Sequence, residues 1–67
     1  MNVETSGLWA GAVWNALNDA NGSLTVKGLK KTTKLKEKEV FAAIGWLARE
    51  GKVNVTEIEK DVEVNLI

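Results

Sequence analysis

Hydrophobic positions along the chain recur first with the period of a helix and later with the period of a strand. Behind Thr5 and Ser6, which are candidates for a helix N-cap, apolar residues keep helical spacing for about four turns. These residues are Trp9, Val13, Ala16, Leu17 and Ala20. The dipeptide Asn21-Gly22 then supplies the left-handed signal that ends many helices. The pattern therefore predicts a first helix that ends near Ala20.

A short strand and a short second helix are expected next. Residues 23–26 are partly β-branched, which favours one or two bridges of a strand. Thr25 is then placed to cap a helix. This second helix is expected to include Val26, Leu29 and Lys30. Leu35 follows as an isolated apolar residue, and we interpret it as part of the turn before the third helix.

The third helix is predicted over residues 36–49. Its apolar residues line one stripe, and Gly51 falls where a helix stops. The stripe consists of Val40, Ala43, Ile44 and Leu47. Its N-cap position falls on Lys36, because Thr32 and Thr33 come too early in the sequence.

Beyond Gly51 the apolar period changes to two. Residues 53–56 and 62–66 both alternate apolar with polar side chains, so they are predicted to form the two strands of a hairpin with a turn near residues 59–61. The last strand, residues 62–67, ends in two consecutive apolar residues. We expect it to be an edge, to which a partner could add a strand unless its acidic residues guard it.

This order of elements and the residues that carry it resemble a known family. The segment from Leu24 to Val55, and especially Ile44-Gly-Trp-Leu-Ala-Arg-Glu-Gly-Lys52, resembles winged helix-turn-helix domains, above all the small stand-alone bacterial members of uncharacterised function. The resemblance implies an α+β fold, mainly α, with a three-helix core, a very short first strand and a C-terminal β-hairpin wing. No repeat or linker is visible, so residues 1–67 are expected to form a single domain. Winged helices bind DNA, RNA or proteins, so the fold leaves the function open.

The composition narrows the chemistry. The 67 residues are 45% apolar and 27% charged, and they include no histidine or cysteine. Without imidazole or thiolate, nucleophilic triads and zinc fingers are excluded. A chain this short also offers little concave volume for a substrate. We therefore expect no enzyme, no metal, no cofactor and no small-molecule substrate.

The location is inferred from the uncharged stretches and the first residues. Residues 7–18 and 41–48 carry no charge, but both are shorter than the roughly 20 residues that span a bilayer. The first four residues, Met-Asn-Val-Glu, lack the basic lead of a secretory signal. We expect no membrane contact and a cytoplasmic location.

The charge is segregated although the total is zero. Residues 27–38 carry a net charge of plus five, from six lysines and Glu37. Lysines four apart on a helix repel one another, and the start of a helix prefers anions. A phosphate backbone would relieve both conflicts, so we hypothesise phosphate contacts, while the alternative is that the lysines only keep a helix face solvated. The six residues are Lys27, Lys30, Lys31, Lys34, Lys36 and Lys38.

The outward face of the third helix is the second candidate site. If the apolar stripe is buried, this face presents Lys38, Ala42, Gly45 and Arg49, with Phe41 and Trp46 at its margins. Only Lys38 and Arg49 are of the types that read base edges. The hairpin is acidic and would repel phosphates, so any binding of double-stranded DNA is expected to be weak or non-specific, provided that the hairpin points away from the duplex.

Two interpretations of the function therefore stay open. One is a winged-helix DNA-binding-type domain with a regulatory role and little base specificity. The alternative is a protein-interaction or homodimerisation module, because Ala42 and Gly45 form a notch beside Phe41 and Trp46, unless these two aromatic side chains instead complete the core. Trp9 and Trp14 are expected to pack in the core rather than to stack on bases.

Overall fold

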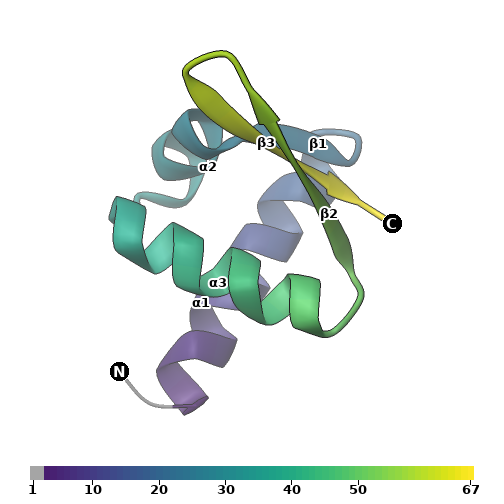
Figure 1. Ribbon diagram of the computed structural model, residues 1–67. Coiled ribbons are helices and arrows are strands. Elements are labelled where there is room, and N and C mark those ends of the chain that lie inside the picture. The colour runs from purple at the N-terminus through teal and green to yellow at the C-terminus, as the bar shows by residue number, and fades with distance from the viewer. Residues whose placement is uncertain (1–2) are drawn as a thin grey trace.

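The computed structural model describes the backbone of residues 3–67 and the side chains from residue 7 onward (Figure 1). Three helices and three strands follow one another in the predicted order. The elements are α1 (Val3–Asp19), β1 (Ser23–Thr25), α2 (Val26–Thr33), α3 (Glu37–Arg49), β2 (Val53–Ile58) and β3 (Asp61–Leu66). This order confirms the expected architecture of a three-helix core, a very short first strand and a C-terminal hairpin.

Helix α1 begins earlier than predicted and ends where the sequence indicated. Thr5 and Ser6 both have helical backbone, so the prediction that one of them is the N-cap is wrong. At the other end Asn21 and Gly22 have positive φ values of 63° and 96°. They stop the helix as predicted.

Helix α2 is fastened to β1 at its first turn. The hydroxyl Oγ1 of Thr25 accepts a hydrogen bond from the N–H of Gly28 at 3.1 Å, which confirms the predicted cap. A Cβ atom added to Gly28 would lie 3.2 Å from Cδ2 of Leu24. A larger residue at this position would require the Leu24 side chain to move by a few tenths of an ångström.

The turn between α2 and α3 is held by hydrogen bonds from its own residues. The hydroxyl of Thr33 donates to the carbonyl of Leu29 at 2.6 Å and accepts from the N–H of Leu35 at 3.2 Å. Lys34 adopts a left-handed backbone with φ of 64°, a conformation usually given to glycine. The turn therefore closes without the glycine that is missing from this part of the sequence.

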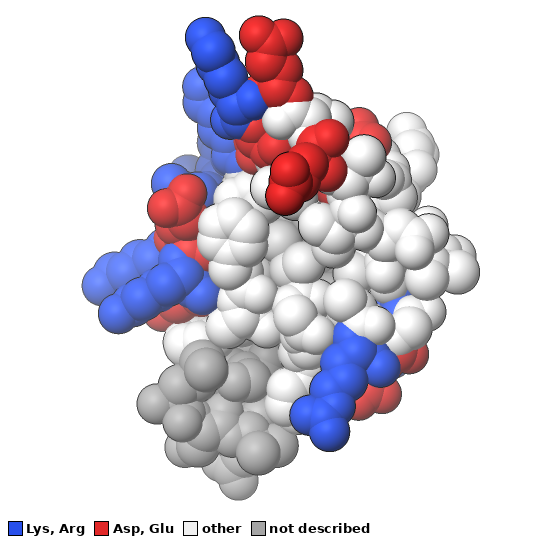
Figure 2. Space-filling model, in the orientation of Figure 1, with Lys and Arg blue, Asp and Glu red and all other residues white. Residues whose placement is uncertain are grey.

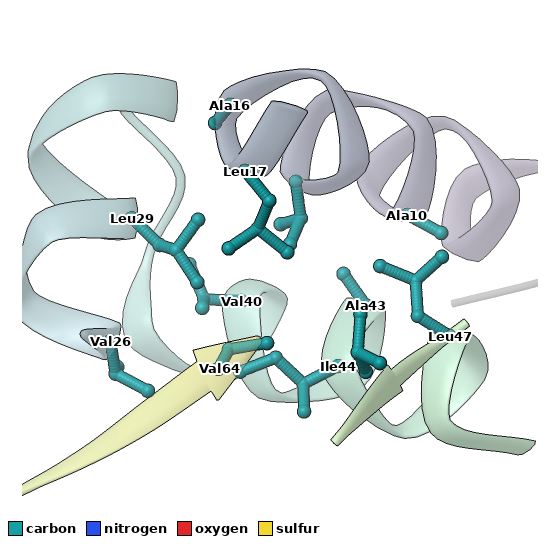
Figure 3. Packing of buried hydrophobic residues seen from close by; sticks show 12 residues of the cluster. Ala10, Ala16, Leu17, Val26, Leu29, Val40, Ala43, Ile44, Leu47 and Val64 are labelled. Carbon is teal, nitrogen blue, oxygen red and sulfur yellow. The ribbon is translucent and has the colours of Figure 1, made fainter. Parts of the chain in front are cut away.

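The core lies between the three helices and one face of the sheet. Figure 3 shows Leu17, Leu29 and Val40 pointing toward one another from the three helices. The predicted inward stripe of α3 is confirmed, because all four of its apolar residues are buried. The buried cluster consists of Ala10, Val13, Ala16, Leu17, Val26, Leu29, Val40, Ala43, Ile44, Leu47, Val53 and Val64.

The sheet is antiparallel with the order β1–β3–β2. The last strand, β3, therefore lies in the centre, and the prediction that residues 62–67 form an edge is wrong. Leu24 of β1 and Val55 of β2 both lie opposite Val64, which is completely buried. The three residues of β1 cover the side of β3 that the sequence left open.

Strand β2 forms the longer edge of the sheet. Its alternating sequence suggests one buried face, yet only Val53 is buried, and Val55 remains 45% exposed. The reason is position, since an outer strand has a neighbouring strand on one side only. The valine therefore contributes less to the core than its place in the pattern suggests.

The core packing predicts that alanine substitutions at two leucines of α1 will differ strongly in their effect on stability. Leu17 is completely buried, whereas Leu8 is 75% exposed. A buried Leu→Ala change costs about 2–5 kcal/mol. The core of a domain this small supplies roughly 3–5 kcal/mol, so Leu17→Ala should leave much of the chain unfolded. Urea denaturation followed by circular dichroism should show this loss, while Leu8→Ala should change the free energy of unfolding by less than about 0.5 kcal/mol.

Candidate nucleic-acid interface

The six lysines of residues 27–38 are all exposed. We call them the lysine patch. Three belong to α2, two to the turn, and Lys38 to the first turn of α3. Most of the basic side chains in Figure 2 project from the left side of the molecule, beside α2 and the start of α3. The lysines that are close together in the sequence thus also lie on one side of the folded molecule.

The start of α3 lacks the usual N-cap chemistry. Lys36 is the N-cap residue, with an extended backbone, as the sequence indicated. Its backbone N–H donates to Oε1 of Glu39 at 2.8 Å, which is one half of a capping box. A lysine side chain has no acceptor atom, so it cannot supply the other half. The first backbone N–H groups of α3 therefore remain available to an anion, with three lysines nearby.

The hairpin turn lies beside part of the lysine patch. Lys60 and Asp61 line a groove of about 280 Å³ together with side chains of α2 and α3. The other lining residues are Val26, Lys27, Lys30 and Glu37. Two carboxylates thus share the groove with three ammonium groups. The acidic hairpin therefore does not point away from the whole patch. It lies beside Lys27 and Lys30, and only the other four lysines are outside the groove that it lines.

Sequence reasoning did not identify Lys60 as a neighbour of the patch. The residue is far from α2 in the sequence and has a left-handed backbone with φ of 65° in the hairpin turn. No local pattern indicates where the tip of a hairpin will lie. Only the pairing of β3 with β1, which packs against α2, brings this turn to the helix.

The outward face of α3 has charged ends and a small apolar centre. Lys38, Gly45 and Arg49 are exposed, and Ala42 is half-buried. Apart from its chain neighbours and the nearby backbone of its own helix, no atom of the described residues lies within 4 Å of a Cβ atom built on Gly45. Phe41 is 44% exposed, whereas Trp46 packs against the core. Phe41 and Trp46 were both predicted to lie at the margins of this face, but their environments differ.

The two tryptophans of α1 also differ. Trp9 packs against the buried cluster, as expected. Trp14 is 38% exposed and lies outside that cluster, so the expectation of core packing is wrong for this residue. It follows the buried Val13 by one position, which turns it about 100° away from the inward stripe of the helix.

Neither a metal site nor a membrane span is found among the described residues. In the part of the chain that the structure describes, no group of three or more carboxylates is placed to hold a metal ion. Nor is any helix among the described residues long and apolar enough to span a membrane. The lysine patch and the outward face of α3 remain the candidate surfaces.

The chain matches a family model and a solved structure. The family model described as "Winged helix-turn-helix domain (DUF2582)" matches residues 1–66. The solution NMR structure of protein BT2368 from Bacteroides thetaiotaomicron shares 33% sequence identity with this chain and superposes with a TM-score of 0.85. The match covers 98% of this chain and 79% of that one. No curated protein matches the sequence.

The geometry at Lys36 predicts a stabilising substitution. Lys36→Ser would complete the capping box with Glu39, because the serine hydroxyl accepts a hydrogen bond and lysine does not. Lys36→Ala removes the same charge without supplying an acceptor. We expect the serine variant to exceed the alanine variant by about 1 kcal/mol in the free energy of unfolding, as measured by urea denaturation. Equal stabilities would contradict the assignment of Lys36 as the N-cap.

Proposed function

We propose that this chain, which belongs to the winged helix-turn-helix domain family DUF2582, is a non-catalytic regulatory domain that binds duplex DNA through its phosphate backbone. The lysine patch makes these contacts, and the base sequence has little influence. The observation that carries the proposal is the exposure of all six lysines on α2, on the start of α3 and on the three-residue turn that joins these helices.

The driving force is the release of counterions from the duplex. Each ammonium group that neutralises a phosphate releases a condensed cation, so affinity falls as salt rises. Helix α2 and the start of α3 bring their lysines to the same side, and the open first turn of α3 offers backbone N–H groups to a phosphate. Such a surface recognises the regular spacing of backbone charges.

Low base specificity follows from the outward face of α3. Direct reading of base edges relies on Arg, Lys, Asn and Gln side chains. On this face only Lys38 and Arg49 are of those types, and they lie at opposite ends of the helix. Between them are Ala42 and Gly45, which are limited to apolar contact with a thymine methyl group or to no side-chain contact at all.

The acidic groups at the hairpin turn limit the affinity. Asp61 and Glu37 share a groove with Lys27 and Lys30, and their charges partly neutralise these two lysines. The remaining four lysines of the patch lie outside that groove. We therefore propose that about four phosphates are neutralised rather than six, which makes the binding weak at physiological salt.

A second candidate function is supported by the exposure of Phe41. A large aromatic ring that is 44% exposed beside the open surface of Gly45 is typical of the anchors at protein interfaces. On this interpretation α3 docks against a protein partner, most simply a second copy of the chain, and the duplex contact is absent.

The salt dependence of binding tests the leading proposal. With about four phosphates neutralised, the logarithm of the affinity for a random-sequence duplex should fall against the logarithm of salt with a slope of about −4. Lys31→Glu should lower the affinity equally for all duplex sequences and reduce that slope by about one. Fluorescence anisotropy at several salt concentrations measures both quantities.

Lys52→Glu is the matched control, because Lys52 is exposed but lies after α3, outside the patch. It should change the slope much less than Lys31→Glu. Lys30→Glu combined with Lys31→Glu should lower the affinity further than Lys31→Glu alone, because it adds a second negative charge to the patch, and circular dichroism checks that the helical content survives the reversal. Binding that ignores salt, or equal effects of Lys31→Glu and Lys52→Glu, would refute the proposal.

The second candidate is tested at Gly45. The space around this residue is open, so Gly45→Leu leaves the monomer intact but fills the notch that a partner helix would enter. If α3 is the docking surface, Gly45→Leu should abolish any self-association seen by sedimentation and leave DNA binding unchanged. Loss of DNA binding with unchanged mass would favour a duplex contact at this face instead.

A further inference from the structure

The outer edge of β2 offers backbone groups to a further strand. In the sheet order β1–β3–β2, β2 is an edge over all six of its residues, whereas the opposite edge, β1, is three residues long. Within the described residues, β3 is the one strand that pairs with β2. An unpaired edge of this length is a template for strand addition.

The register identifies which groups point outward. The N–H of Ile67 donates to the carbonyl of Lys52 at 3.0 Å, so Lys52 faces β3. Residues of an antiparallel strand direct their hydrogen-bonding groups alternately to either side. Because the pairing continues without a bulge, residues 54, 56 and 58 also bond to β3. Val53, Val55 and Glu57 therefore present their N–H and C=O groups at the free edge.

This edge carries few of the features that block pairing. Proteins protect edge strands with prolines, bulges, inward charges or short length. The strand Val53–Ile58 has no proline and no bulge, and Glu57 is its one charged residue. Every residue after Val53 is exposed, including Val55 at 45% and Ile58 at 42%. The edge is therefore accessible along its length and partly apolar.

We propose that a second copy of this chain adds to this edge, so that two β2 strands pair antiparallel about a two-fold axis. Such an axis runs perpendicular to the sheet, and it pairs residues of the same face with each other. The two three-stranded sheets then join into one continuous sheet of six strands. This inference is independent of DNA binding.

One register satisfies the edge completely. With Val55 opposite Val55 of the second copy, Val53 lies opposite Glu57, and the three outward residues of each strand bond only to one another. Shifting the axis to Thr56 pairs Val53 with Glu59 of the hairpin turn and brings Lys52 opposite Lys60. Shifting it to Glu57 sets two carboxylates against each other, which is unfavourable. With the two-fold axis at Val55, no like charges lie opposite each other, and the most exposed valine of the strand is covered.

The dimer leaves the lysine patch free. Helix α2 packs against β1 and β3, and β2 lies on the far side of β3 from β1 (Figure 1). Two patches in one particle raise the avidity for a polyanion without any new contact. The second copy is favoured as the occupant because the identical strand, with Val55 opposite Val55, meets every outward backbone group of this edge without placing like charges opposite each other.

Cysteine crosslinking tests the register. The chain has no cysteine, so each single variant reports on one position. In the proposed dimer the two Cα atoms at position 55 are about 5.5 Å apart, within the range that a disulfide bridges. Val55→Cys should therefore form a disulfide dimer under mild oxidation. Ile58→Cys is the matched control, since its two copies lie about 20 Å apart in this register.

Amide exchange of the unmodified chain gives a second measurement that does not depend on a variant. As the concentration rises, the N–H groups of Val53, Val55 and Glu57 should become protected, while those of Asn54, Thr56 and Ile58 are protected throughout. The sedimentation mass should rise in parallel. A chain that stays monomeric with unprotected outward amides, equal crosslinking at positions 55 and 58, or a dimer that Gly45→Leu abolishes would overturn the proposal.

Discussion

The rotation of α3 about its own axis is the constraint on which the surface of this protein depends. Val40, Ile44 and Leu47 are buried against α1 and the sheet, and burying a side chain of this size contributes about 1.5–3 kcal/mol. No single exposed contact matches that amount. Once these residues point inward, Lys38, Gly45 and Arg49 must face outward. The properties of the candidate interface therefore follow from the core.

The same balance explains how a cluster of like charges is held together. An eight-residue helix is too short to be stable alone, and repulsion between lysines four apart costs a few tenths of a kcal/mol for each pair. Val26 and Leu29 anchor α2 in the core, and the cap at Thr25 adds about 1 kcal/mol. Burial and capping exceed the repulsion, so α2 keeps its lysines on one side of the molecule.

The sequence predicted what depends on local periodicity, and it missed what depends on long-range pairing. The inward stripe of α3 and the stop at Gly22 follow from spacing and backbone preference within a few residues. The central place of β3 does not, because alternation in residues 62–66 is the same for an edge and an inner strand. The position of Lys60 beside α2 follows from that pairing. The cap at Thr5 or Ser6 failed because hydroxyl residues also occur inside helices.

The departures from local preference gather in the segment that carries the candidate site. Lys34 has a left-handed backbone, which costs a non-glycine residue on the order of 1 kcal/mol, and Lys36 occupies a cap position without an acceptor. Together with the lysine repulsion, these costs are large for a domain with a core of this size. Such conflicts are expected at functional sites. Glu39 accepts the N–H of Lys36, and Asp61 shares a groove with Lys27 and Lys30, so the chain itself supplies part of the negative charge that a phosphate would otherwise bring. A polyanion that binds here therefore competes with these carboxylates, and the strength of that competition separates a DNA-binding surface from a solvated one.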